Sequence, residues 1–261
     1  MKLDDFRYMY RGHVLKALEP LEASLLAPVD REGTARNRAL LLLHGFSSSP
    51  AVYRRMLPLL SMYDTVICPV LPGHGQSIEA FSSTKAGDWI ESTMQACEKL
   101  TTSYKQVDVM GMSLGGLLAC HLSKHFQLNH VYLLAPALSL RLNIPFCLTA
   151  AKMLQTLGIS RIPSRAGNLY SKAHPELAYR QLPLPVIIQI LTMIKEFQLV
   201  LPSCPVDLFL GRYDRVVNSY KVAAHFQKNT RIHWLNHSAH VLPLDEDMEE
   251  IIACVKNNHH D

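Results

Sequence analysis

Ser113 lies at the centre of the sequence Gly111-Met112-Ser113-Leu114-Gly115, which fits the pattern G-x-S-x-G. A serine becomes an exposed nucleophile on a strained strand-to-helix turn, and such a turn leaves no room for side chains two residues away. Gly111 and Gly115 meet that requirement. An apolar run precedes the motif and a helix-like stretch follows it. The pattern predicts a nucleophilic Ser113, and the alternative is a glycine-rich turn whose serine only caps the helix.

His240 is the histidine best placed along the chain to act as the general base that a serine nucleophile needs. Where this motif serves catalysis, the nucleophile comes first, the acid second and the histidine last. His240 follows the last apolar run, and His237 is the alternative on the same loop. His233 lies within that run, where we expect a structural role. His259 and His260 are expected in a frayed C-terminal tail.

Asp214 is the predicted acid of this set, because it comes shortly after the fifth apolar run of the chain. A carboxylate there can accept a hydrogen bond from Nδ1 of His240 and fix the tautomer of the ring. Asp207 is the rival, although it lies inside the predicted strand. The alternative interpretation of Asp214 is a surface carboxylate that pairs with Arg212 or Arg215.

Two backbone N–H groups are predicted to bind the oxyanion of a tetrahedral intermediate. One belongs to Leu114, directly after the nucleophile, and the other to Phe46, in the loop after an early apolar run. The ring of Phe46 is expected either in an acyl pocket or in the core. His74, in the sequence PGHG, is expected to hold a tight loop near the site. No cluster of carboxylates or histidines suggests a metal site.

Short apolar runs that alternate with helix-like segments must position these residues. Unbroken apolar runs are typical of strands that are covered on both faces of a parallel sheet. They occur at 39–43, 65–71, 107–110, 131–135, 205–210 and 231–235. The helix-like segments occupy about 50–62, 86–103, 114–126, 218–228 and 244–257. The alternation predicts an α/β fold with a mostly parallel, doubly wound sheet.

The stretch 138–203 interrupts this rhythm, because it shows no clear strand and prolines divide it into short helical pieces. It is too long for a bare loop in a compact domain. We therefore expect a helical cap, or lid, at 138–203, inserted into a core formed by 1–137 and 204–261. Such a cap would lie over the strand ends where a ligand binds. A separate helical domain is the alternative.

Composition limits the remaining classes of function. The net charge of +4 at pH 7 is small and scattered, so we expect no nucleic-acid partner. We expect neither a signal peptide nor stable membrane insertion, because no suitably long apolar stretch is visible. The six cysteines lack CxxC spacing, which is typical of reduced thiols in a cytoplasmic protein. Whether the protein is a monomer or a homodimer stays open.

The sequence resembles the α/β-hydrolase superfamily, and within it the bacterial carboxylesterases and monoacylglycerol lipases. The matching segments lie between about 39 and 255 and read LLLLHGFSSSP, PVLPGHGQS, DWIESTMQACEKL, VDVMGMSLGGLLA, LFLGRYDRVVN and HSAHVLPLDEDMEEI. The family usually has Gly where Ala239 stands and a second acid where Tyr213 stands. The resemblance implies a serine esterase with the α/β-hydrolase fold that needs no cofactor. Its small-molecule substrate would be a carboxylic ester with a short or medium acyl chain, or a monoacylglycerol.

Other activities use the same three residues and stay open from sequence: a thioesterase, a C–C bond hydrolase, a haloperoxidase-like enzyme or an acyltransferase. A receptor that only binds a ligand would be expected to lack part of the triad, whereas all three members are present. A third alternative is a lipase at a membrane surface. Its docking face would be one apolar cap helix, although the same spacing is typical of a helix packed on its own core. The positions concerned are Val186, Ile187, Ile190, Leu191 and Ile194.

Overall fold

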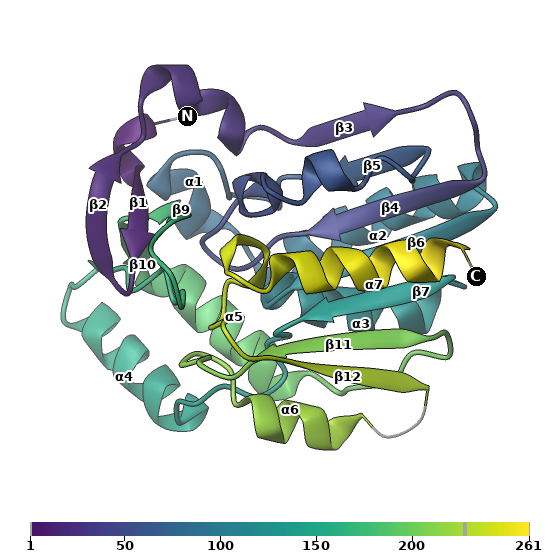
Figure 1. The fold of residues 1–261 in the computed structure, drawn as a ribbon. Coiled ribbons are helices and arrows are strands. Elements are labelled where there is room, and N and C mark those ends of the chain that lie inside the picture. The colour runs from purple at the N-terminus through teal and green to yellow at the C-terminus, as the bar shows by residue number, and fades with distance from the viewer. Residues whose placement is uncertain (1, 227–228, 261) are drawn as a thin grey trace.

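The computed structural model describes residues 2–226 and 229–260. At its centre is a seven-stranded sheet in the order β12-β11-β7-β6-β4-β5-β3 (Figure 1). The strands are β3 (Val29–Glu32), β4 (Arg38–Leu43), β5 (Thr65–Cys68), β6 (Gln106–Met112), β7 (His130–Leu134), β11 (Val206–Gly211) and β12 (Thr230–Leu235). All pairings in this sheet are parallel except that of β3 with β5. The predicted mostly parallel sheet is confirmed.

The order of the strands reverses between β4 and β6. The chain first adds β5 on one side of β4 and then adds β6 on the other side. In open α/β sheets, ligands bind outside the carboxyl ends of the strands at such a point. Phe46 follows β4 and Ser113 follows β6, so the topology brings the two predicted loops together.

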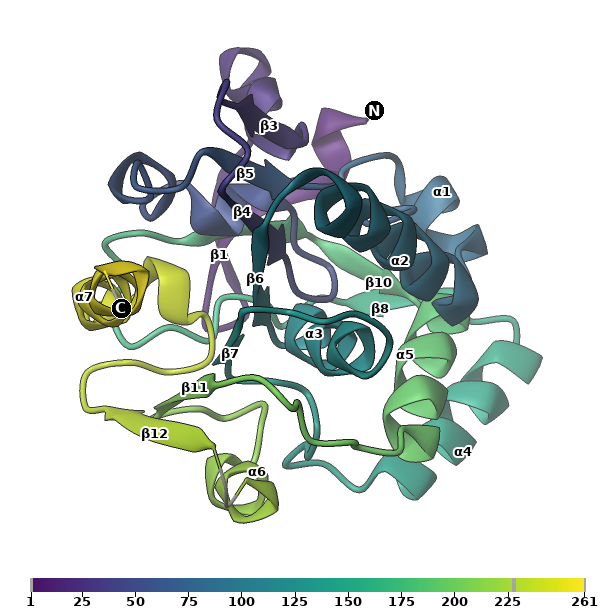
Figure 2. The ribbon, with the colours of Figure 1, turned by 90° about the vertical axis from the view of Figure 1, so that its right-hand side faces the viewer.

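Both faces of the sheet are covered, which explains why its strands read as unbroken apolar runs. One face packs against α2 (Ala86–Ser103), α3 (Leu114–His125) and α6 (Ser219–His225). The other face packs against α7 (Met248–His260) and two 3₁₀ turns at 50–53 and 57–59. Figure 2 shows α7 on one side of the sheet and α2 with α3 on the other.

Three of the predicted helices differ from the structure. The helix expected at 50–62 is wrong, because the segment forms only the two 3₁₀ turns; the ring of Pro58 removes an N–H that a continuous helix would need. The helix expected at 218–228 corresponds to α6, and 227–228 lie outside the described residues. The helix expected at 244–257 begins only at Met248 and continues to His260, so the expected frayed tail is also wrong.

The segment 138–203 lies between β7 and β11 of the sheet and is called the insertion; it contains two helices, α4 (Ile144–Thr156) and α5 (Leu184–Glu196). It also contains three short strands, so the expectation of a stretch without strands is wrong. β8 (Arg161–Pro163) pairs with β10 (Gln181–Pro183), and β9 (Glu176–Tyr179) pairs with a strand near the N-terminus. Strands of three or four residues with remote partners leave no local periodicity by which to predict them.

Residues 6–17 form a hairpin beside the insertion. β1 (Phe6–Tyr10) pairs with β2 (His13–Ala17) on one side and with β9 on the other. Figure 1 shows this hairpin and α4 at the same end of the molecule. Helix α1 (Ile78–Ser83) and 3₁₀ turns at 3–5, 20–26 and 242–244 complete the described elements. None of the helices in 2–226 and 229–260 is both long and apolar enough to cross a membrane.

Candidate active site

Ser113 sits on the turn between β6 and α3 with a backbone φ of 55°. This left-handed conformation is uncommon for a residue with a side chain, and the surroundings must hold it in place. A Cβ on Gly111 would lie 2.2 Å from the carbonyl oxygen of Gly115, and a Cβ on Gly115 would lie 2.0 Å from that of Leu43. Close backbone contact therefore requires glycine at both positions of the motif.

His240 and Asp214 form a hydrogen-bonded chain with Ser113. Nε2 of His240 lies 3.0 Å from Oγ of Ser113, and Nδ1 of His240 lies 2.8 Å from Oδ2 of Asp214. All three residues are buried. They occupy separate loops after β6, β11 and β12, in the order Ser, Asp, His. The structure thus brings the three predicted side chains into the contacts that general-base activation of a serine requires.

The loop of Asp214 holds its carboxylate in one orientation. Oδ1 accepts hydrogen bonds from the N–H groups of Val216 (2.7 Å) and Val217 (2.8 Å), which leaves Oδ2 for His240. Burial alone would lower the pKa of His240, but the hydrogen bond to Asp214 and the charges of Asp214 and Glu176 outweigh burial. The pKa of His240 is therefore raised above its ordinary value, which makes the ring a stronger base.

The rival histidines lie away from Ser113. His237 has an exposed side chain, and its Nδ1 is 3.3 Å from Oδ1 of Asp247. His233 lies on β12, and its Nε2 is 2.6 Å from Oδ1 of Asp207. Asp207, the rival acid, is thus paired with His233 inside the sheet and does not contact His240.

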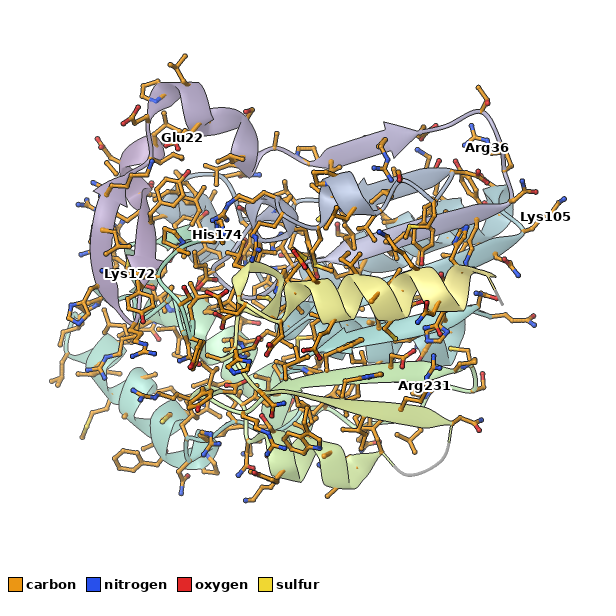
Figure 3. The ribbon with its side chains drawn as sticks, in the orientation of Figure 1. Glu22, Arg36, Lys105, Lys172, His174 and Arg231 are labelled. Atoms are coloured by element: carbon orange, nitrogen blue, oxygen red, sulfur yellow. The ribbon has the colours of Figure 1, made fainter. Side chains whose placement is uncertain are left out.

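Asp207, His233 and Cys254 form the one group of three potential metal ligands found in 2–226 and 229–260. The side chains of His130, His233, Arg231 and Asn258 already donate hydrogen bonds to the carboxylate of Asp207. A cation would have to displace Arg231 from that carboxylate, so we interpret the group as a structural ion-pair network. Figure 3 shows Arg231 at the opposite end of the sheet from His174 of the insertion.

The loop after β4 packs closely against Met112 and Ser113. A Cβ on Gly45 would lie 2.7 Å from Cε of Met112 and 3.4 Å from Cβ of Ser113. Phe46 and Leu114 line the same cavity as Ser113. As the first residue of α3, Leu114 has no acceptor for its N–H within the helix. Both predicted oxyanion donors therefore belong to residues on the walls of the cavity that Ser113 lines.

Two buried histidines hold this loop in place. Nε2 of His44 accepts a hydrogen bond from the N–H of Leu71 (3.0 Å), and Nε2 of His74 accepts one from the N–H of Ser47 (3.2 Å). Burial lowers the pKa of His44 to about 4 and that of His74 well below its ordinary value. Both rings therefore stay neutral and keep Nε2 free to accept, and His74 holds the loop as expected.

Two cavities meet at Ser113. The larger has a volume of about 500 Å³, and α4 and α5 supply most of its apolar wall. The side chain of Phe46 contributes to this wall and also packs against Phe81 and Trp89 in the core. The smaller cavity has a volume of about 150 Å³. Its polar side chains are those of Ser47, Ser113, Arg165, Asn168, Glu176 and His240.

Sequence reasoning missed two buried acids beside the site. Glu176, on β9, accepts a hydrogen bond from the N–H of Gly167 (2.6 Å), and burial raises its pKa. Asp245 accepts hydrogen bonds from the N–H groups of Ala239 (2.7 Å) and Tyr170 (2.8 Å) and so fixes the chain beside His240. Glu176 carried one available signal, since it is the only Asp or Glu between 109 and 195.

Helix α5 packs on the core and is not an exposed lipid-binding face. Val186, Ile190, Leu191 and Ile194 are at most 8% exposed. Ile187 lines the larger cavity. The alternative that this helix docks on a membrane is therefore wrong.

The profile of the alpha/beta hydrolase family matches residues 40–253. The chain belongs to this family. A thermostable monoacylglycerol lipase from Bacillus sp. (strain H-257) is 29% identical to this hydrolase over 224 residues, which cover 82% of the chain and 86% of the relative.

Solved structures agree with this assignment. A structure described with LipS and LipT, two metagenome-derived lipolytic enzymes, matches with a TM-score of 0.81 at 24% identity, over 90% of the hydrolase and 97% of that chain. The monoacylglycerol lipase of Paleococcus ferrophilus matches with a TM-score of 0.67 at 18% identity, over 90% of the hydrolase and 98% of that lipase chain. The predicted α/β-hydrolase fold is confirmed.

Proposed function

We propose that this hydrolase cleaves carboxylic esters through an acyl-enzyme on Ser113, with His240 as general base and Asp214 as the acid that orients it. The observation that carries the proposal is the buried chain of hydrogen bonds from Asp214 through His240 to Ser113, at 2.8 and 3.0 Å. The sequence similarity to a monoacylglycerol lipase supports the same reaction class.

In the proposed reaction, Oγ of Ser113 attacks the ester carbonyl carbon while Nε2 of His240 takes its proton. The N–H groups of Phe46 and Leu114 stabilise the oxyanion. His240 then gives the proton to the oxygen of the leaving alcohol. It next takes a proton from a water molecule that attacks the acyl-enzyme, and it returns that proton to Oγ of Ser113 as the carboxylic acid leaves. The carboxylate of Asp214 stabilises the imidazolium in each half, and no cofactor is needed.

The two cavities at Ser113 suggest how an ester is bound. An apolar cavity of about 500 Å³ lies within the size range of small-molecule sites and suits an acyl chain. The polar cavity of about 150 Å³ offers hydrogen-bonding groups for the alcohol, from Arg165 and Glu176. We therefore propose the monoacyl ester of a small polyol, such as a monoacylglycerol, as substrate. The insertion 138–203 then serves as the lid that covers the acyl chain.

A substrate panel tests this proposal. Monoacylglycerols and p-nitrophenyl esters of increasing chain length would be compared with acyl-thioesters, using the wild-type protein and Ser113→Ala. We expect ester hydrolysis that Ser113→Ala abolishes, and higher kcat/KM for monoacylglycerols than for esters of simple alcohols. Hydrolysis of thioesters alone would assign a thioesterase, and equal rates for all alcohols would remove the role of the polar cavity.

A second candidate function is ester hydrolysis at a lipid surface, which the outer face of α4 favours. Phe146, Met153 and Leu157 are 71%, 64% and 72% exposed and recur at helical spacing. Phe146 also lines the larger cavity. Between 138 and 175 there are five Lys or Arg residues and no Asp or Glu. A cytoplasmic enzyme, as the cysteines predict, would meet anionic lipid with this face.

Vesicle binding tests this second candidate. We expect the wild-type protein to sediment with vesicles of phosphatidylglycerol and not with those of phosphatidylcholine, and Phe146→Ser/Met153→Ser/Leu157→Ser to lose that binding. Tyr220→Ser is the control, because Tyr220 is an exposed aromatic on α6. Equal binding by the triple variant, or none by the wild-type protein, would reject a lipid-docking face.

A further inference from the structure

Asn168, in the insertion, bonds to both loops that hold the acid and the histidine. Its carbonyl oxygen accepts hydrogen bonds from the N–H groups of His240 (2.9 Å) and Val241 (3.2 Å). Its side-chain Oδ1 accepts a hydrogen bond from the N–H of Arg215 (2.9 Å), the residue after Asp214. One residue thus connects the loop after β11 with the loop after β12, outside the contact that Asp214 and His240 make with each other.

The chain around Asn168 is itself firmly held. The N–H of Gly167 donates to Glu176 on β9 (2.6 Å), and the carbonyl oxygen of Gly167 accepts from the N–H of Arg11 in the N-terminal hairpin (2.6 Å). Leu169 is fully buried in the core. Asn168 therefore belongs to a rigidly held segment, so its hydrogen bonds can fix the positions of the two loops.

A second connection repeats the pattern on the histidine side. The carboxylate of Asp245 accepts hydrogen bonds from the N–H groups of Tyr170 and Ser171 in the insertion and from that of Ala239, which precedes His240. The histidine loop is thus held to the insertion by Asp245 as well as by the carbonyl of Asn168. The acid loop also bonds to Ser139 and Arg141 at the start of the insertion. It bonds directly to the histidine loop through the N–H of Tyr213, which donates to the carbonyl oxygen of Ser238 (3.1 Å). Its hydrogen bond to the segment 164–171 is the one that Oδ1 of Asn168 accepts from Arg215.

We propose that Asn168 is a positioning residue of the proposed ester hydrolysis: its side chain sets the Asp214 loop relative to the His240 loop. The proposal rests on the proposed function of the triad. Asn168 acts through Asp214, which must lie within hydrogen-bond distance of Nδ1 to hold the ring and to stabilise its charged form. Displacement of a catalytic group by about 1 Å lowers rates by up to about a hundredfold. The insertion then helps to assemble the active site as well as covering it.

The test is a comparison of Asn168→Ala with Asn168→Asp. Alanine removes the bond to Arg215 and leaves the backbone bonds to His240, so we expect kcat to fall by about tenfold or more with KM unchanged. Aspartate keeps an acceptor at Oδ1 and is expected to restore kcat to within a fewfold of wild type. Asn143→Ala is the matched control, because it removes the same type of bond, to Phe146 N–H, at a site that contacts neither loop. We expect its kcat to be that of wild type.

A double-mutant cycle with Asp214→Asn separates positioning from a general structural effect. If Asn168 acts through the Asp214 carboxylate, Asn168→Ala should reduce kcat little further once that carboxylate is gone. An equal fold-loss in both backgrounds, an unchanged kcat in Asn168→Ala, or a raised KM alone would overturn the proposal. If Asn168→Ala does not fold, Asn168→Ser, whose oxygen is one atom nearer the backbone, replaces it. Activity that survives Ser113→Ala would instead reject the proposed function.

Discussion

Gly211 is the position at which a single methyl group should disrupt the site most selectively. This last residue of β11 lies under the histidine loop, and a Cβ there would meet the carbonyl oxygen of Ala239 at 1.9 Å and that of Ser238 at 2.7 Å. Both contacts are with backbone, which cannot rotate away as a side chain would. Gly211→Ala must therefore displace the chain directly before His240.

The size of the effect follows from that distance. Nonbonded atoms settle at roughly 3.5 Å, so the carbonyl of Ala239 has to retreat by about 1.6 Å. A shift of this size in His240 breaks its contacts of 3.0 Å to Ser113 and 2.8 Å to Asp214. We expect kcat to fall about a hundredfold, which corresponds to about 2.7 kcal/mol of transition-state stabilisation.

The assay is steady-state hydrolysis of a soluble p-nitrophenyl ester, measured well below the melting temperature of each variant. Overpacking also destabilises a folded protein by about 1–3 kcal/mol, so a lower Tm is expected alongside the lower kcat. Gly87→Ala is the control, because a Cβ at Gly87, in α2, meets no atom within 4 Å. A Gly211→Ala protein with kcat within twofold of wild type would refute this reasoning.

Three further predictions concern the acid, the pH dependence and the acyl chain. Asp214→Asn should lower kcat by about 10⁴-fold while the protein stays folded, and steady-state kinetics with kcat near wild type would contradict its role. Because His240 accepts a proton only when neutral, kcat/KM should rise with pH through its raised pKa. Glu176→Gln removes one charge that raises this pKa, so the midpoint of the pH profile should move to lower pH. An unmoved or higher midpoint would argue against an influence of Glu176 on the pKa of His240. Ile187→Trp narrows the larger cavity and should shift the preference in an ester panel towards shorter acyl chains. An unchanged preference would mean that the acyl chain does not bind in this cavity.

The strands of the sheet were predictable from sequence, because burial on both faces leaves a local pattern of consecutive apolar residues. Leu40, Leu41 and Leu42 are buried on both faces of β4 and so appear as an unbroken apolar run. The glycines around Ser113 are likewise a local requirement, since contacts of 2.0–2.2 Å exclude any Cβ. Residues that follow strand ends in a parallel sheet converge by topology, and this made Asp214 and His240 predictable.

What the sequence could not reveal depends on remote partners. β9 forms a strand because it pairs with β1, and no periodicity in either segment indicates that pairing. Asn168 and Asp245 accept hydrogen bonds from the N–H groups of Arg215 and Tyr170, which lie far away in the sequence, and every residue except proline has such a group. The 3₁₀ turns at 50–59 replaced an expected helix because prolines outweigh an apolar pattern there.

Covalent labelling tests most directly whether Ser113 is an activated nucleophile. The folded wild-type protein would be treated with a fluorophosphonate, digested and examined by mass spectrometry. We predict one adduct per chain, on the peptide that contains Ser113, and no adduct in Ser113→Ala. Absence of an adduct in the wild-type protein, or equal labelling of Ser113→Ala, would contradict the proposed mechanism.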